Sequence, residues 1–163
     1  MFKILFVIIV AIILIVIVWE FFYIQTVSKE EIFIFPENFK GVVLVVHNQK
    51  DGVITEKENG KTIYRVPQNG ILKIKTPLKP TLSKTWYYFE DIKGQRMEFF
   101  YCFENKEMGK NKNKIYTCGL STGTYQQGND KIECTTFLVG TAKEIDSLSK
   151  VVEKLKPIEL LKK

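Results

Sequence analysis

Hydrophobic positions form one long stretch near the amino terminus and many short stretches after it. In the long stretch, residues 4–24, Glu20 is the single charged residue. A helix rises about 1.5 Å per residue, so this stretch would span about 31 Å, close to the hydrocarbon thickness of a bilayer. Trp19 and Tyr23 flank Glu20, as aromatic residues do at membrane interfaces. The pattern predicts a transmembrane helix that contacts the lipid bilayer through residues 4–24.

A cleaved signal peptide is the alternative interpretation of this stretch. Lys3 supplies a minimal positive region, but the apolar stretch exceeds the usual signal length and no Ala-x-Ala sequence follows it. We therefore favour an uncleaved anchor. The amino terminus and Lys3 are positive, whereas the other flank contains Glu20, Lys29, Glu30 and Glu31, and this difference favours a cytoplasmic amino terminus. We predict a single-pass protein of the cell membrane whose following domain is periplasmic or extracellular.

Beyond residue 31, short stretches rich in β-branched and aromatic residues alternate with turn residues. Asp51-Gly52, Asn59-Gly60 and Asn69-Gly70 are typical turn dipeptides. Turn residues recur at the spacing of about 8–12 residues that is typical of sandwiches and barrels. We predict strands over residues 31–36, 41–49, 53–58, 61–66, 71–76, 85–91, 95–105, 114–119 and 131–140.

The end of the chain has the period of a helix. Thr141 and Glu144 fit a capping box. One helical face then collects the apolar residues Ile145, Leu148, Val152 and Leu155. The predicted fold is therefore mainly β: a transmembrane helix, then an antiparallel β-sandwich with one C-terminal amphipathic helix. The expected boundaries are an anchor at 1–24, a linker at 25–31, the sandwich at 32–140, and the helix and tail at 141–163.

The charge of the chain limits the classes of partner that we expect. The net charge of the chain is +6, and its first 28 residues contribute nothing because Lys3 and Glu20 cancel. Arg65 and Arg96 are the two arginines, and the lysines are dispersed. Phosphate recognition favours arginine, and single-strand binding needs interleaved aromatic residues. We therefore expect no nucleic acid as a partner, and we expect an envelope protein or an anionic polymer instead.

Candidate catalytic chemistry is sparse. His47 is the only histidine and alternates with Val43 and Val45 at the end of a predicted strand. The sequence contains no second histidine for a metal cluster and no G-x-S-x-G motif. We predict no catalytic, cofactor or metal site, and a protein that is not an enzyme. The alternative is an envelope hydrolase with Asp51, Glu56, Glu58 and His47 as candidate groups, which would need Asp51, Glu56 and His47 in one apolar cleft.

The three cysteines are Cys102, Cys118 and Cys134, sixteen residues apart each time. If their strands form an antiparallel meander, the thiols lie in one row with Cys118 in the middle. A disulfide would then join Cys118 to Cys102 or to Cys134 in an oxidising compartment. We favour three partly buried thiols without a bond over this disulfide.

Three segments carry a family resemblance: PENFKG (Pro36–Gly41), YRVPQNGIL (Tyr64–Leu72) and YYFEDIKGQR (Tyr87–Arg96). They resemble an uncharacterised bacterial family of membrane- or lipid-anchored envelope β-domains. More distantly, the pattern is similar to β-sandwiches of the prealbumin and carboxypeptidase-regulatory type. The resemblance implies a small exported domain and supplies no catalytic residues. We expect a non-enzymatic binding or structural protein of the cell envelope, with an immunity or inhibitor protein as an alternative.

Overall fold

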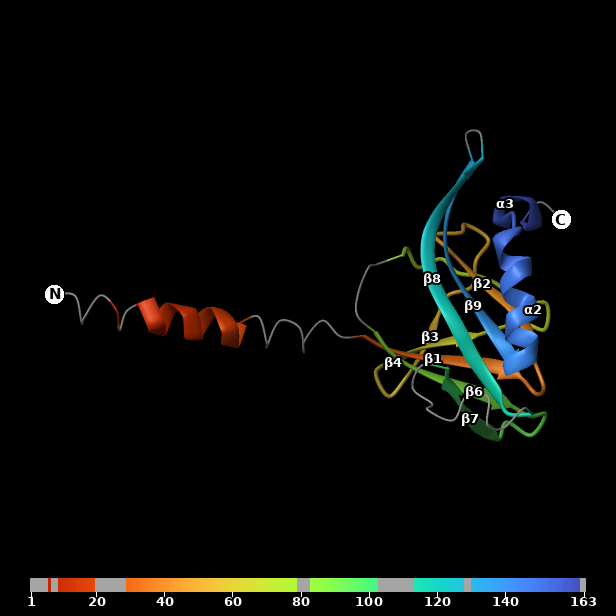
Figure 1. Ribbon diagram of the computed structural model, residues 1–163, viewed down its shortest axis with the longest axis horizontal. Helices are drawn as coiled ribbons and strands as arrows, with labels where there is room; N and C mark the ends of the chain where they lie inside the picture. Colours follow the sequence, from red (N-terminus) through yellow and green to blue (C-terminus); the bar gives the residue numbers. More distant parts are fainter. Residues whose placement is uncertain are drawn as a thin grey trace.

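The computed structural model describes residues 6, 9–19, 29–78, 83–102, 113–127 and 130–161 (Figure 1). Residues 9–19 are helical, and their large apolar side chains are exposed, including Trp19 at 73%. Within the described ranges, no helix has the length and apolar content needed to cross a bilayer. The predicted anchor extends beyond these ranges, and Tyr23 and the first linker residues lie outside them.

One nine-stranded sheet forms the body of the domain (Figure 1). The strands are β1 (Lys29–Pro36), β2 (Gly41–His47), β3 (Glu56–Glu58), β4 (Lys61–Arg65), β5 (Ile71–Lys73), β6 (Ser83–Glu90), β7 (Arg96–Tyr101), β8 (Ile115–Gln127) and β9 (Asp130–Thr141). Their order in the sheet is β3-β4-β1-β6-β7-β8-β9-β2-β5. The sheet curls into a half-barrel, with β3 and β5 at its two edges.

Parallel pairings make this sheet mixed. β1 runs parallel to both β4 and β6, β2 runs parallel to β5, and β7 runs parallel to β8. The other four pairings are antiparallel. The prediction of a mainly β fold with a C-terminal helix is confirmed, but an antiparallel sandwich is wrong. Alternation along a strand determines which face each side chain takes, and it leaves the neighbouring strand undetermined.

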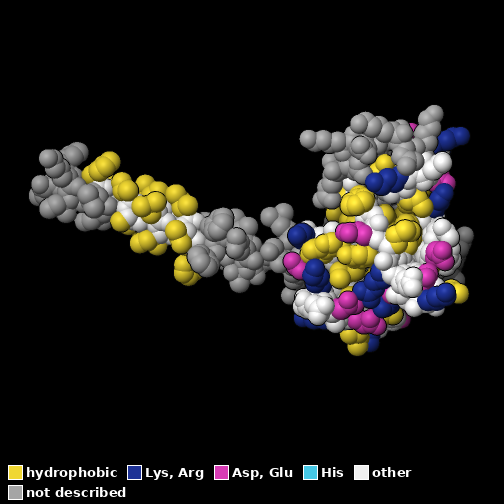
Figure 2. Space-filling view, turned by 90° about the horizontal axis from the view of Figure 1, so that it is seen from below, with side chains coloured by type: hydrophobic (Ala, Val, Ile, Leu, Met, Phe, Trp, Pro, Cys, Tyr) yellow, Lys and Arg dark blue, Asp and Glu magenta, His cyan; other side chains and the backbone are white. Residues whose placement is uncertain are grey.

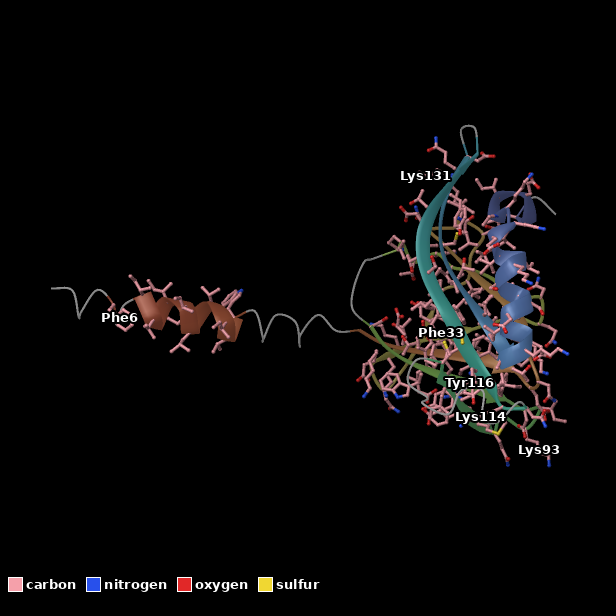
Figure 3. All side chains as sticks on the ribbon, viewed as in Figure 1. Phe6, Phe33, Lys93, Lys114, Tyr116 and Lys131 are labelled. Atoms are coloured by element: carbon pink, nitrogen blue, oxygen red, sulfur yellow. The ribbon has the colours of Figure 1, made fainter. Side chains whose placement is uncertain are left out.

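Aromatic rings fill the concave side of the sheet. Phe33 on β1 lies 5.1 Å from Phe137 on β9, and Phe89 on β6 lies 4.3 Å from Phe99 on β7, between ring centres. Phe33 is labelled in Figure 3, within the curled sheet. Because β1 and β9 are far apart in the strand order, these contacts show that the two halves of one sheet fold onto each other. The resulting core has two facing walls, as in a sandwich.

Helices cover only part of the convex side. α2 (Ala142–Glu153) begins at the predicted capping box and packs Ile145 against β8 and β9. The short helix α3 (Pro157–Leu160) follows and buries Ile158 beside β2 and β9. Both helices lie on the same side of β8 and β9 (Figure 1). The outer face of β1, β4 and β6 carries a separate apolar cluster with no described helix over it.

Candidate functional site

A cavity of about 550 Å³ lies where the two edges of the half-barrel approach each other. β4 contributes Ile63–Arg65 to its wall, β5 contributes Ile71–Lys73, and the segment at residues 53–56 crosses between them. Leu161, after α3, closes one side. Cavities of about 300–1,000 Å³ are typical of small-molecule sites. The open edges of this sheet therefore produce a space of ligand size.

Gly52 allows the crossing segment to approach β5 closely. The Val53 N–H donates to the Lys73 carbonyl at 2.9 Å, and the Lys75 N–H donates to the Val53 carbonyl at 3.0 Å. A Cβ atom at Gly52 would lie 2.5 Å from the backbone carbon of Ile74. Only glycine fits here without movement of the backbone, so the sequence positions this wall of the cavity through one missing side chain.

Ion pairs stand on both sides of the cavity mouth. Lys73 Nζ lies 2.9 Å from Asp51 Oδ2, and Arg65 Nε lies 3.4 Å from Glu56 Oε2. The hydrogen bond from Lys73 is the main cause that holds the pKa of Asp51 below its ordinary value. The Asp51 carboxylate is thus ionised, and each of the two carboxylates lies beside a basic side chain. A mouth with both signs of charge over an apolar interior suits a ligand with an apolar body and polar groups.

Tyr64 forms an aromatic wall of the cavity. Its ring stacks on Phe33 with 4.7 Å between centres, and its hydroxyl donates to Glu31 Oε1 at 3.2 Å. Burial, followed by the negative charge of Glu31, raises the pKa of Tyr64 above its ordinary value. The hydroxyl therefore stays protonated at neutral pH, and Tyr64 joins the cavity directly to the aromatic core.

The four residues of the hydrolase alternative do not meet in one place. Asp51 and Glu56 line the cavity, whereas Glu58 bonds to Arg96 and does not line it. His47 is also outside the cavity lining, 8% exposed, with its Nε2 3.1 Å from Thr135 Oγ1. Burial is the main cause that lowers the pKa of His47. The structure thus brings together two carboxylates of the predicted four residues.

A second hollow of about 1010 Å³ lies at the amino-terminal end of α2. Two of its charged side chains, Glu144 and Lys40, already take part in the cap of α2. Glu144 accepts a hydrogen bond from the Thr141 N–H at 2.8 Å and pairs with Lys40 Nζ at 2.9 Å. The bond from Thr141 contributes most to lowering the pKa of Glu144 to about 2. We interpret this hollow as the helix cap.

The three cysteines are buried free thiols and do not form the predicted row. β7 and β8 are parallel, with Tyr101 opposite Thr117, so Cys102 lies beside Cys118. Cys134 is instead opposite Val46 and packs in a different apolar cluster. The row is wrong because the register of the antiparallel β8–β9 pair differs from the expected one: Cys118 is opposite Leu138, and Cys134 is opposite Gly123. Of the two candidate disulfides, the β7–β8 register favours Cys118 with Cys102, and that bond stays a prediction.

Sequence reasoning did not find the cavity itself. Val53 and Ile54 are 55% and 77% exposed at its wall, although both are apolar. Two apolar residues in a turn-rich segment are a weak signal, because isolated exposed apolar residues are common. Leu161 lies beyond the predicted helix and gave no signal. Among the described residues, no three His, Cys, Asp or Glu side chains are grouped as metal ligands.

Comparison with known proteins gives one family and one similar fold. The family of unknown function DUF6843 matches residues 27–147. A crystal structure of a "Putative Lipoprotein from Bacillus anthracis" is similar with a TM-score of 0.52 and 19% sequence identity, over 69% of this chain and 70% of that one. No curated protein matches the sequence. At this identity the crystal structure supports the fold alone. Since the family covers most of the domain, the chain belongs to DUF6843, a family whose function is unknown.

Proposed function

We propose that this protein is a single-pass, membrane-anchored protein of the bacterial envelope. Its exported half-barrel would bind a partner at the cavity between β4 and β5 without catalysing a reaction. The apolar stretch at residues 4–24 supports the anchor. The similar fold of a protein described as a lipoprotein supports a location in the envelope.

The cavity is the observation on which the binding role rests. Its apolar lining and its two matched ion pairs at the mouth suit an amphipathic ligand or an apolar segment of another polypeptide. Ion pairs of this exposed kind contribute little to stability. Their position at the mouth therefore points to recognition more than to folding.

Site-specific photo-cross-linking tests this role in cells that express the full chain. A photoreactive phenylalanine analogue replaces Ile54, at the cavity wall, or Ile92, which is 98% exposed and is not among the cavity-lining residues. The two positions are matched in residue type and differ in place. We expect a cross-linked adduct at position 54 and none at position 92.

Filling the cavity provides the second arm of this test. Thr55→Trp places a large side chain at the cavity wall and should abolish the adduct at position 54. Adducts of equal yield at positions 54 and 92, or an adduct that persists when the cavity is filled, would contradict binding in the cavity. Recovery of the chain outside the membrane fraction would contradict the anchor.

A hydrolase is the second candidate, because Asp51 and Glu56 line the same cavity. Paired carboxylates on either side of a cleft are the machinery of glycoside hydrolysis. In that case, Asp51→Asn with Glu56→Gln would abolish release of soluble fragments from purified cell-wall polymer. Under the binding role, the purified full chain releases no fragments, and this pair of substitutions leaves the core of the domain folded.

A further inference from the structure

The outer face of β1, β4 and β6 carries an apolar strip away from the helices. Ile32, Ile34 and Ile63 form its floor, and Trp86 and Tyr88 lie beside them, half-buried. In the described part of the chain, α2 and α3 pack instead on β2, β8 and β9. Figure 2 shows apolar side chains gathered on the underside of the domain, bordered by charged side chains of both signs.

Lysine side chains lie over aromatic rings on this face. Lys61 Nζ is 3.6 Å and Lys84 Nζ is 5.0 Å from the ring centre of Trp86. Lys114 Nζ is 4.8 Å from the ring centre of Phe100, which is 42% exposed. These five residues are called the lysine–aromatic face below. An ammonium group over a ring is held by the electron-rich face of that ring.

The strand register brings these residues onto one surface. Tyr87 is opposite Phe99 in the β6–β7 pair, and both rings belong to the aromatic core. The neighbouring residues Trp86 and Phe100 therefore lie next to each other on the opposite, outer side. Figure 3 shows Lys114 and Tyr116 at the same end of β8. Aromatic rings flanked by lysines are typical of surfaces that sit at a membrane interface.

Charge is unevenly distributed over this surface. At the beginning of β1, Glu30 is opposite Lys84 and also pairs with Lys61 Nζ at 3.3 Å, so two lysines share one acid. Lys29 is the first residue of the same strand. Of the other acids beside the strip, Glu56, Glu58 and Glu90 form ion pairs with Arg65 and Arg96, and Glu98 lies opposite Tyr88. On the outer face at the beginning of β1, two lysines therefore lie beside one acid.

The beginning of β1 is also the part of the domain closest in sequence to the proposed anchor. If the membrane helix ends at Ile24, residues 25–28 join it to Lys29. An extended chain spans at most about 3.6 Å per residue, so Lys29 lies within about 18 Å of the end of the helix. A tether this short holds Lys61, Lys84 and Trp86 close to the lipid surface.

We propose that the lysine–aromatic face docks on the anionic surface of the membrane that holds the anchor. The inference rests on the proposed anchor and adds the orientation of the domain, with the outer face of β1 and β6 on the lipid. Each lysine near an anionic leaflet should favour the docked state about fivefold. The Trp86 ring would lie at the level of the headgroups, where tryptophan is enriched.

Fluorescence of Trp86 measures this docking directly. Trp19→Phe leaves Trp86 as the single tryptophan of the full chain. The variant is reconstituted into phosphatidylcholine vesicles, with or without phosphatidylglycerol, in which lipids brominated near the headgroup quench nearby tryptophan. We expect strong quenching of Trp86 in the anionic vesicles and weak quenching in the neutral ones. Raising salt from about 0.15 to about 1 M should reduce the quenching, because the screening length falls from about 8 to about 3 Å.

A matched pair of triple variants separates specific docking from net charge. Lys61→Gln, Lys84→Gln and Lys114→Gln remove three positive charges from the face and should abolish the quenching. The control variant carries Lys143→Gln, Lys150→Gln and Lys154→Gln, which remove three exposed charges from α2 and its end. It should keep most of the quenching of Trp86. Circular dichroism confirms that both variants are folded.

The outcomes distinguish this proposal from the proposed function. A chain that co-floats with the vesicles while Trp86 remains unquenched is anchored but not docked, and overturns the inference alone. Equal loss of quenching in the two triple variants also overturns it, since net charge would then suffice. A chain that does not co-float overturns the anchor and the docking together.

Discussion

At the scale of single residues, one missing side chain determines the geometry of the cavity wall. Gly52→Ala would place Cβ 2.5 Å from the backbone carbon of Ile74 and push the crossing segment away from β5. Overpacking of this kind costs about 1–3 kcal/mol. We therefore expect the free energy of unfolding to fall by about 2 kcal/mol, measured by urea denaturation followed by circular dichroism.

Gly123→Ala is the matched control for this substitution. A Cβ atom at Gly123 meets no atom within 4 Å, and its backbone is not left-handed. Gly123→Ala should change the free energy of unfolding by no more than about 0.5 kcal/mol. Similar losses for the two variants would show that flexibility of glycine, and not the contact with Ile74, determines the effect.

Single residues also show how far the sequence could predict the site. His47 was predicted to be an ordinary residue at a strand end, and it lies there with Thr135 as its partner. The cavity was missed because it joins residues 51–56 to residues 63–74 and to Leu161. Neither periodicity nor motif spacing shows which distant segments meet, so a site made by two sheet edges leaves no local pattern.

At the scale of elements, the capping box ties α2 to the loop before β2. Glu144 accepts from the Thr141 N–H at 2.8 Å, and Lys40 reaches the same carboxylate at 2.9 Å. The pKa of Glu144 is about 2 in the folded chain, below its ordinary value of 4.5. The ionised carboxylate therefore stabilises the fold above pH 4.5, and this contribution is lost as the pH falls through about 2.

Glu144→Gln tests this contribution. At pH 7 the variant should be less stable by about 0.5–1 kcal/mol, the usual size of a half-exposed cap. The difference from the wild type should shrink between pH 4.5 and about pH 2 in thermal unfolding. Glu153→Gln, at the exposed carboxyl end of the same helix, is the control and should not lower the free energy of unfolding. A difference that is independent of pH would refute the role of the ionised carboxylate.

The secondary-structure elements were predicted better than the pairing of the strands was. The predicted turn at Asn59-Gly60 joins the antiparallel strands β3 and β4, and the predicted strands at 85–91 and 95–105 are the antiparallel neighbours β6 and β7. The strand predicted to end at Gly119 instead continues to Gln127. Gly119 has φ +69° and lies at an irregularity in the β8–β9 pairing, so it interrupts the register without ending the strand. Glycine marks a bulge as readily as a strand end. The parallel pairs of β1 had no local signal, because their partners lie far away in the chain.

At the scale of the whole molecule, the redox state of two thiols would report the compartment of the domain. Cys102 lies beside Cys118, and the Cys102 N–H donates to the Thr117 carbonyl at 2.8 Å. Burial is the main cause that raises the pKa of the Cys118 thiol. If the domain is exported, we expect a disulfide-exchange oxidant to accept two electrons and two protons from this pair. The disulfide would close a loop of about fifteen residues and contribute about 3 kcal/mol.

Thiol labelling checks this prediction on cells. After denaturation, the full chain should show one free thiol without reduction and three with reduction, read as mass shifts from a maleimide. Cys134→Ala should keep the disulfide, and Cys118→Ser should abolish it. Three free thiols that are shielded until lysis would place the domain in the cytoplasm, against the proposed orientation.

The pairing of β2 with β9 also determines when the domain can fold. Val43 on β2 is opposite Phe137 on β9, and Phe33 on β1 is opposite Tyr87 on β6. Both pairings join residues that lie far apart in the chain. Chains dominated by such distant pairings fold slowly, because a long loop must close before the contact stabilises anything. During synthesis, β2 can pair early with the short edge strand β5, but its long partner β9 is absent until almost the whole chain has been made. If the domain is exported as proposed, this late closure would keep it unfolded while its first strands cross the membrane, which is the state that export through a narrow channel requires.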